Sequence, residues 1–174
     1  TKQLTITKGS RTFTMDTTRT IAGGTGYFGS GTMTQATTVN GQTFSMVLDG
    51  PNRTLTQSTP TGRSRVIRYD TLGRMVAAES GAGLSPLTLR FGPTGLLESY
   101  QSGERIESYE YDASRQMTAI VDPLRRTTLE HDGAGRVNAT VDPIGRNELV
   151  WNADGSLASF RIGGGSAHTL SSDM

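Results

Sequence analysis

The chain has 174 residues, of which 33% are hydrophobic and 19% are charged, and its formal net charge is +1. This balance of charge excludes the electrostatic footprint of a nucleic-acid-binding protein and a polybasic membrane segment. The lack of cysteine excludes a disulfide scaffold and a cysteine-ligated zinc site. No apolar run approaches the roughly 18 residues of a membrane span. The 26 threonines suit a pleated sheet better than a helix, so the composition favours an all-β protein.

Residues 1–47 are rich in Thr and Gly and show the two-residue alternation of β-strands. The segments that alternate are Leu4–Thr7, Thr12–Met15, Met33–Val39 and Gln42–Leu48. The last two flank Asn40-Gly41, a dipeptide typical of a tight two-residue hairpin turn. We therefore expect residues 1–47 to form a β-hairpin region that leads into the rest of the chain.

The C-terminal half repeats with a period of ten residues. Each repeat begins a turn-like stretch with Asp or Asn, and the positions are Asp112, Asp122, Asp132, Asp142 and Asn152. Asp or Asn suits the first position of a type I turn and Pro the second, whereas Gly three residues on accepts the positive φ that closes a bulged hairpin. The spacing therefore predicts a chain reversal every ten residues.

Six residues remain between successive turns, and they alternate as half-buried strands do. The expected strands are Gln116–Val121, Arg126–His131, Arg136–Val141 and Arg146–Trp151. The alternation predicts that one face carries Met117, Ala119, Val121, Leu129, His131, Val137, Ala139, Val141, Leu149 and Trp151. The opposite face then carries Arg126, Thr128, Glu130, Arg136, Asn138, Thr140, Arg146 and Glu148. Because short turns join neighbouring strands, we expect an antiparallel β-meander with no helix.

A second period of about twenty residues extends the pattern upstream. An aromatic ring precedes every second turn, at Tyr69, Phe91, Tyr111, His131 and Trp151. The predicted turn positions are Asp70, Gly73, Arg74, Asp112, Asp122, Asp132, Gly135, Arg136, Asp142, Gly145 and Arg146. Pro60-Thr-Gly62-Arg63 has the same form as Pro143-Ile-Gly145-Arg146. We expect the repeats to span residues 48–162 and a flexible tail to span residues 163–174.

The strings Tyr69-Asp70-Thr-Leu-Gly73-Arg74 and Tyr109-Glu-Tyr111-Asp112 resemble the YD repeat of the RHS family, which includes toxin-complex components and teneurins. The family unit is roughly Tyr-Asp-x-x-Gly-Arg-Leu, recurring about every twenty residues. The likeness covers residues 48–162, although His131 and Trp151 replace Tyr and the Phe91 copy lacks both Asp and Arg. The resemblance implies a segment of an antiparallel sheet that curls or spirals into a hollow shell.

The resemblance also implies a function. A segment of this kind is non-catalytic and helps to enclose or display another part of its parent protein, such as a C-terminal toxin. Its partners would be the flanking β-strands of the same shell and an encapsulated toxin domain, with self-association through open sheet edges in isolation. It would be secreted or on the cell surface. The alternative is a β-sheet module that binds carbohydrate or a receptor through Tyr, Trp and Arg. Neither reading involves nucleic acid or a membrane span.

Three motifs suggest chemistry but have simpler explanations. Gly24-Thr-Gly26-Tyr-Phe-Gly29 matches the dinucleotide-binding pattern, but no helix-forming sequence follows it, so we expect a loop. His131 occupies an aromatic repeat position, and His168 lies in the tail. Asp142-Pro-Ile-Gly145 resembles the self-cleavage site of bacterial RHS proteins, although it is also one of the regular ten-residue units. We predict no catalytic residue, no metal ligand, no cofactor and no enzyme activity.

Overall fold

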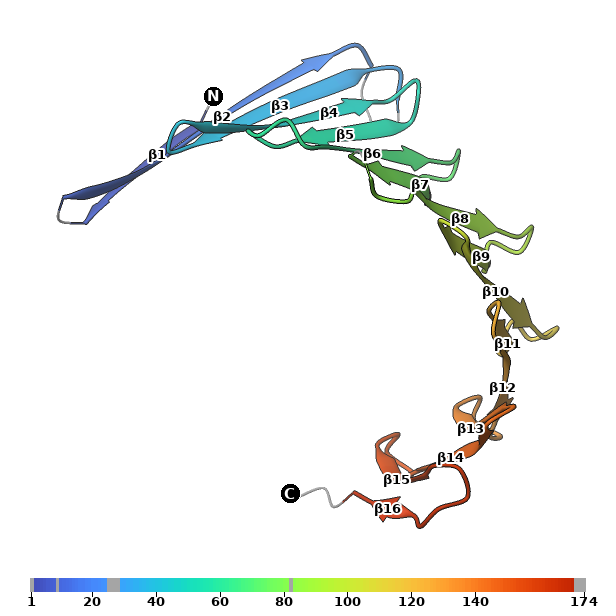
Figure 1. The fold of residues 1–174 in the computed structure, drawn as a ribbon. Coiled ribbons are helices and arrows are strands. Elements are labelled where there is room, and N and C mark those ends of the chain that lie inside the picture. The colour runs from blue at the N-terminus through green and yellow to red at the C-terminus, as the bar shows by residue number, and fades with distance from the viewer. Residues whose placement is uncertain (1, 9, 25–28, 82, 171–174) are drawn as a thin grey trace. The chain divides into compact units, whose positions relative to one another are not determined.

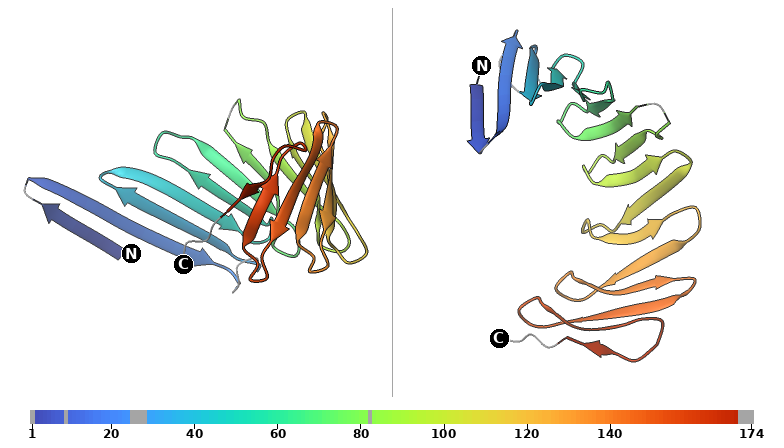
Figure 2. Two further views of the ribbon diagram at one scale, coloured as in Figure 1. Left: turned by 90° about the horizontal axis from the view of Figure 1, so that it is seen from below. Right: turned by 60° about the vertical axis from the view of Figure 1, so that its left-hand side comes forward.

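The computed structural model describes residues 2–8, 10–24, 29–81 and 83–170, and within them the secondary structure is entirely β-strand and turn (Figure 1). No helix in the described part of the chain is long and apolar enough to cross a membrane. The chain divides into two compact units, residues 1–89 and 90–174. In both units each strand pairs antiparallel with its neighbour in sequence, as two views of the ribbon show (Figure 2).

The first unit is a meander of long strands followed by shorter ones. Its strands are β1 (Lys2–Lys8), β2 (Arg11–Ala22), β3 (Thr32–Val39), β4 (Gln42–Asp49), β5 (Thr54–Ser58), β6 (Ser64–Tyr69), β7 (Met75–Ser80) and β8 (Leu87–Phe91), the last of which contains the boundary between the units. The predicted turn between β3 and β4 is confirmed, because Asn40 and Gly41 have φ values of 49° and 79°.

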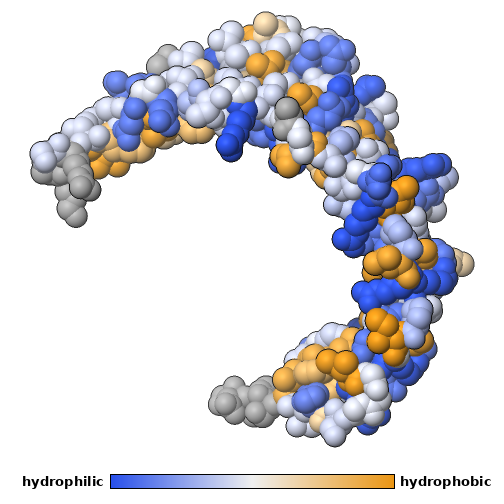
Figure 3. Space-filling model, viewed as in Figure 1, coloured by the Kyte–Doolittle hydropathy of each residue, from blue (hydrophilic) through white to orange (hydrophobic). Residues whose placement is uncertain are grey.

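The first unit has one apolar face, which we define by the residues that share it through the strand register. They are Leu4, Ile6, Phe13, Met15, Ile21, Met33, Phe44, Met46, Leu48, Leu55, Ile67 and Ala78. Leu48, Leu55, Ile67 and Ala78 form its buried core, and Met33, Met46, Tyr69, Met75 and Leu87 pack against them. Figure 3 shows apolar side chains in a band along β1 to β3. The opposite face is rich in Thr and Ser.

The second unit is the repeat meander that the sequence predicts. Its strands are β9 (Leu97–Ser102), β10 (Arg105–Tyr111), β11 (Met117–Val121), β12 (Arg126–His131), β13 (Val137–Asp142), β14 (Gly145–Trp151), β15 (Leu157–Arg161) and β16 (His168–Thr169). The four predicted strands correspond to β11 through β14, and all five predicted reversals occur. The short strand β16, which pairs with β15, lies in the segment expected to be a tail.

The predicted division of side chains between the two faces is wrong in part. Glu130 pairs with Ala139 but His131 pairs with Val137, so Asn138 is an extra residue that forms a β-bulge. The bulge reverses the alternation after Val137, which shares a face with His131 while Ala139 lies on the opposite face. The same shift occurs in β11, where Met117 lies on the face of Tyr111 and Ala119 on the face of Glu110.

The corrected faces of the second unit are chemically distinct. We define its aromatic face as Tyr109, Tyr111, Met117, Ile120, Leu129, His131, Val137, Thr140, Leu149, Trp151, Leu157 and Phe160. Its charged face comprises Glu110, Ala119, Val121, Arg126, Thr128, Glu130, Ala139, Val141, Arg146, Glu148 and Arg161. Each strand therefore separates apolar rings from ion pairs.

Candidate functional site

The turns that follow an aromatic residue share one hydrogen-bonded design. In the turn at Asp132, one carboxylate oxygen accepts hydrogen bonds from the backbone N–H groups of Ala134 at 2.9 Å and Arg136 at 3.0 Å. The other oxygen accepts the Arg136 Nε–H at 2.8 Å. These bonds, with the Arg136 side chain the largest contributor, hold the pKa of Asp132 below its ordinary value. The aspartate thus caps the turn and orients the arginine.

The turn at Asp70 repeats this geometry. Its carboxylate accepts the backbone N–H groups of Leu72 and Arg74 at 2.8 and 2.9 Å and the Arg74 Nε–H at 2.7 Å. Gly73 and Gly135 have φ values of 78° and 79°, which places both in the left-handed region where glycine avoids a Cβ clash. The Gly92 turn closes in the same way without an acid, through backbone bonds to Leu96 and from Gly95.

The turn at Asp112 lacks glycine at its fourth position but keeps the backbone path. Arg115 occupies that position with a φ of 68°, a conformation that costs a non-glycine residue about 1 kcal/mol. Its guanidinium donates to the carbonyl oxygen of Thr94 at 2.9 Å, twenty-one residues earlier. The departure from the repeat pattern therefore places an arginine where it reaches the preceding turn of the same type.

The Asp-Pro turns have a different construction. Asp122 pairs with Arg125 and Asp142 with Gly145, so each loop contains only two residues. The Asp142 carboxylate accepts the backbone N–H groups of Ile144 and Gly145 at 2.9 and 3.1 Å. Gly145 does not have a positive φ, so the expectation of a left-handed glycine there is wrong. Arg125 Nη1 lies 3.2 Å from an Asp142 carboxylate oxygen and links successive loops of this kind.

The likeness drawn between Pro60-Thr-Gly62-Arg63 and the Asp142 loop is also wrong. The Thr59 N–H donates to the Arg63 carbonyl at 2.8 Å, and the Gly62 N–H donates to the Thr59 carbonyl at 3.0 Å. Gly62 has a φ of 80°. This is the bulged design found at Asp70, so the strand register, and not proline, selects the loop.

All five predicted aromatic positions are half-buried, and two of them donate a hydrogen bond to a neighbouring strand. Tyr111 Oη donates to the Leu97 carbonyl at 2.9 Å, and Trp151 Nε1 donates to the Val137 carbonyl at 2.7 Å. In both cases the acceptor lies fourteen residues earlier. The Arg136 guanidinium lies 5.9 Å from the Trp151 ring centroid and donates to the Asn152 carbonyl at 3.0 Å. The rings therefore connect one repeat to the next.

The charged face contains a feature that the sequence analysis missed. Arg126 forms a bidentate pair with Glu110, and Arg146 forms one with Glu130 at 2.6 and 2.8 Å. Each pair joins residues sixteen apart on strands β10 and β12, or β12 and β14, and crosses the strand between them. Where they cross, the register places alanines, Ala119 and Ala139, whose side chains are 0% exposed.

These ion pairs follow from side-chain size. A guanidinium can lie flat across a strand only if the residue beneath is small, so alanine at the crossing permits the contact. The pairing raises the pKa of Arg146, chiefly through its hydrogen bond with Glu130. The available signal was Glu and Arg recurring twenty residues apart with alanine midway, but the expectation was for pairs between adjacent strands.

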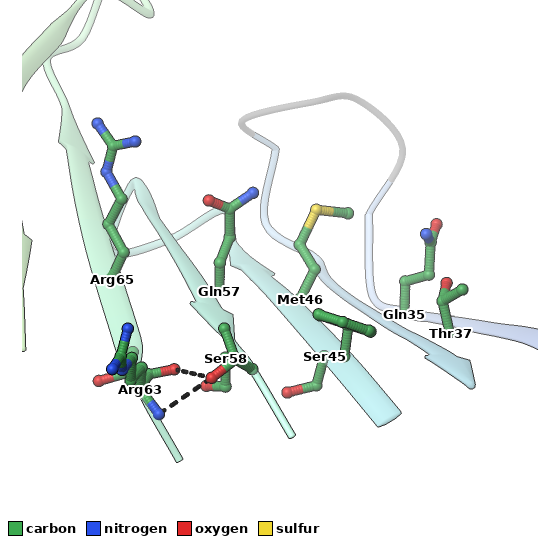
Figure 4. A pocket seen from close by; sticks show the side chains of 11 residues that line it. Gln35, Thr37, Ser45, Met46, Gln57, Ser58, Arg63 and Arg65 are labelled. Atoms are coloured by element: carbon green, nitrogen blue, oxygen red, sulfur yellow. Dashed lines mark hydrogen bonds between the residues drawn. The ribbon is translucent and has the colours of Figure 1, made fainter. Parts of the chain in front are cut away.

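Two grooves lie away from the turns at the aromatic positions. One of about 450 Å³ lies on the apolar face of the first unit, and Gln35, Met46, Gln57 and Arg65 are among its lining residues (Figure 4). The other, of about 550 Å³, lies at the Asp-Pro loops, where Leu124 and Ile144 are 93% and 85% exposed.

The remaining motifs do not assemble a reaction centre in the described residues. Residues 25–28 of the glycine motif lie outside them, and the segment that follows is strand β3 instead of the helix that dinucleotide binding requires. The His168 ring stacks on Phe160 at 4.9 Å, and no cluster of three or more potential metal ligands occurs among the residues that were placed. The turn aspartates are bound to backbone N–H groups, which is a structural use of a carboxylate.

The sequence matches no known family profile and no curated protein. The fold is similar to that of chains in two solved structures. One is a crystal structure of TcdB2-TccC3-Cdc42, with a TM-score of 0.54, and the other is a Photorhabdus luminescens Tc holotoxin pore with a mutation in TccC3, with a TM-score of 0.55. In each case the sequence identity is 14%, and the match covers 74% of this chain. This chain spans about 8% of the chains it matches.

This similarity confirms the predicted fold class, an antiparallel sheet of the kind found in toxin-complex shells. That the aromatic and turn positions carry the function of the chain, and that residues 48–162 form a unit of their own, stay predictions.

Proposed function

We propose that the chain is a non-catalytic wall segment of an RHS-like shell that encloses or displays another part of its parent protein. The supporting observation is the interlocking of repeats. Arg136 reaches the next turn of its own type, and the Glu110–Arg126 and Glu130–Arg146 pairs recur with a shift of twenty residues. Interactions that repeat by translation can be extended by further repeats without changing their geometry.

The unpaired outer edges support the same role. Among the described strands, β1 pairs only with β2, and β16 pairs only with β15. An unpaired edge exposes a row of N–H and C=O groups that accepts a further strand. The flanking partners we propose are therefore strands of the same sheet. A toxin as the enclosed part and a secreted or cell-surface location follow from the fold similarity and belong to this proposal.

Hydrogen exchange compares the two environments of β1 directly. The isolated chain and the polypeptide in which the chain naturally occurs would be analysed by mass spectrometry of peptides covering residues 2–8. We expect these amides to exchange rapidly in the isolated chain and at least ten times more slowly in the natural polypeptide, whereas peptides covering β12 remain protected in both. Equal, rapid exchange at β1 in both would refute a continuous wall.

Carbohydrate or receptor binding is the second candidate. Trp151 is the obvious platform for a sugar ring, but its N–H is bonded to Val137 and its ring lies near Arg136. These contacts use the indole within the sheet. Glycan-array binding that is lost on Trp151→Ala but kept on Tyr100→Ala, with both variants folded, would favour this second candidate over the wall.

A further inference from the structure

The first unit distributes its charges unequally. Residues 1–89 contain nine Lys and Arg residues against four Asp and Glu residues. Three of the four acids, Asp16, Asp49 and Glu79, lie on strands, and the register places each of them on the face opposite the apolar face. The fourth, Asp70, is bound to Arg74 in its turn. The strand residues of the apolar face therefore include no carboxylate in the described part of the unit.

The same face carries exposed guanidinium groups. The register aligns one residue from each of five successive strands in a row, namely Arg19, Gln35, Met46, Gln57 and Arg65. Figure 4 shows Gln35, Met46, Gln57 and Arg65 standing on the same side of neighbouring strands, along the groove of about 450 Å³. Arg19 Nη2 donates to the Gln35 side-chain oxygen at 2.9 Å. The row thus has a cation at each end and amides between.

The two cations at the ends of the row have no counter-ion within the described residues. Neither Arg19 nor Arg65 forms an ion pair there, whereas Arg68, on the same strand as Arg65 but on the opposite face, lies 3.2 Å from Glu79. An exposed guanidinium offers a planar set of donors that matches a carboxylate in two parallel hydrogen bonds. The apolar face therefore holds unused capacity for binding carboxylates.

Exposed apolar side chains surround these cations. The large hydrophobic residues of β1 to β4 with the greatest exposure are Leu4, Ile6, Phe13, Ile21 and Phe44, at 37% to 64%, and all five lie on the apolar face. Such a patch marks an interaction surface when polar groups border it. Its partner must therefore present apolar groups together with negative charge.

We propose that the apolar face of the first unit binds an acidic, apolar polypeptide segment. Its carboxylates pair with Arg19 and Arg65, and its apolar side chains cover Ile21, Phe44 and Met46. The two arginines lie four strand spacings apart, or about 19 Å, which is too far for one small anion but is the length of about six extended residues. This inference identifies a surface and a partner class beyond the wall role and does not depend on it.

Binding to synthetic peptides tests the proposal. The probe is a fluorescent twelve-residue peptide of alternating Glu and Leu, compared with the same peptide carrying Gln in place of Glu. We expect the Glu peptide to bind at least ten times more tightly and its affinity to fall as salt is raised, because exposed ion pairs are screened. Arg65→Gln and Arg19→Gln should each weaken binding by about fivefold.

Arg68→Gln is the matched control, because it removes a guanidinium from the same strand on the opposite face. It should leave the peptide affinity unchanged, and circular dichroism would check that each variant is folded. Equal binding of the Glu and Gln peptides, or equal losses for Arg65→Gln and Arg68→Gln, would overturn the proposal. So would binding to phosphatidylserine vesicles that depends on Arg65 when the Glu peptide does not bind, since the partner would then be an anionic membrane.

Discussion

Replacing two glycines that occupy the same sequence position should have opposite effects on stability. Gly145 and Gly155 each lie three residues after the Asp or Asn that begins a turn. Gly155 has a φ of +88°, and a Cβ there would meet nothing within 4 Å, so backbone strain alone opposes substitution. Gly145 has no positive φ, and its Cβ would lie 3.5 Å from the Gly163 Cα, an ordinary contact.

The magnitudes follow from the backbone. Gly155→Ala should destabilise the chain by about 1 kcal/mol, because an L-residue in the left-handed region places Cβ against its own carbonyl. Gly145→Ala should stabilise it by about 0.5 kcal/mol, because alanine restricts the unfolded chain and the folded conformation tolerates it. For a chain of this size, 1 kcal/mol corresponds to a change of about 2–4 °C in Tm.

Urea unfolding measured by tryptophan fluorescence would check both values. The chain contains one tryptophan, Trp151, which lies on β14 between the two glycines. The midpoint should fall for Gly155→Ala and rise for Gly145→Ala, with the slope m unchanged. Equal destabilisation by both substitutions would contradict the assignment of two loop types.

Two further predictions concern the ion pairs and the turns. Ala139→Leu should destabilise the chain by about 1–3 kcal/mol, since a larger side chain would displace the ion pair that covers it; Ala113→Leu, in an exposed turn, should change the urea midpoint little, and equal effects would argue against the crossing. Asp132→Asn should lower Tm at pH 7 but not at pH 2. The folded pKa of Asp132 is lowered, so its contribution is present above the unfolded pKa and is lost as the pH falls through the folded one. A Tm difference that persists at pH 2 would show that the carboxylate charge is not the cause.

The sequence predicted the strands of the second unit because turn chemistry and two-residue alternation agreed there. It could not predict the faces, since the extra residue at Asn138 is visible only in the pairing of Glu130 with Ala139 and of His131 with Val137. The loop at Gly145 shows the same limit. The letters Pro-x-Gly occur both there and at Pro60, yet the hairpin register gives two loops of different length.

The ion pairs were missed for a related reason. A sequence pattern suggests contacts between adjacent strands, whereas Arg146 contacts Glu130 two strands away. This contact requires both the register and the small size of Ala139. The apolar face of the first unit was missed because alternation shows that one side is apolar, but only pairing across five strands aligns Arg19 with Arg65.

The reach of the Glu130–Arg146 contact affects how the chain comes apart. In a stack of hairpins coupled only to immediate neighbours, a terminal strand can fray alone, and cooperativity decays within one hairpin. A contact that skips a strand ties the second neighbour to the first, so loss of β14 also frees the carboxylate on β12. Fraying from the C-terminal end should therefore advance in steps of a full twenty-residue repeat instead of strand by strand.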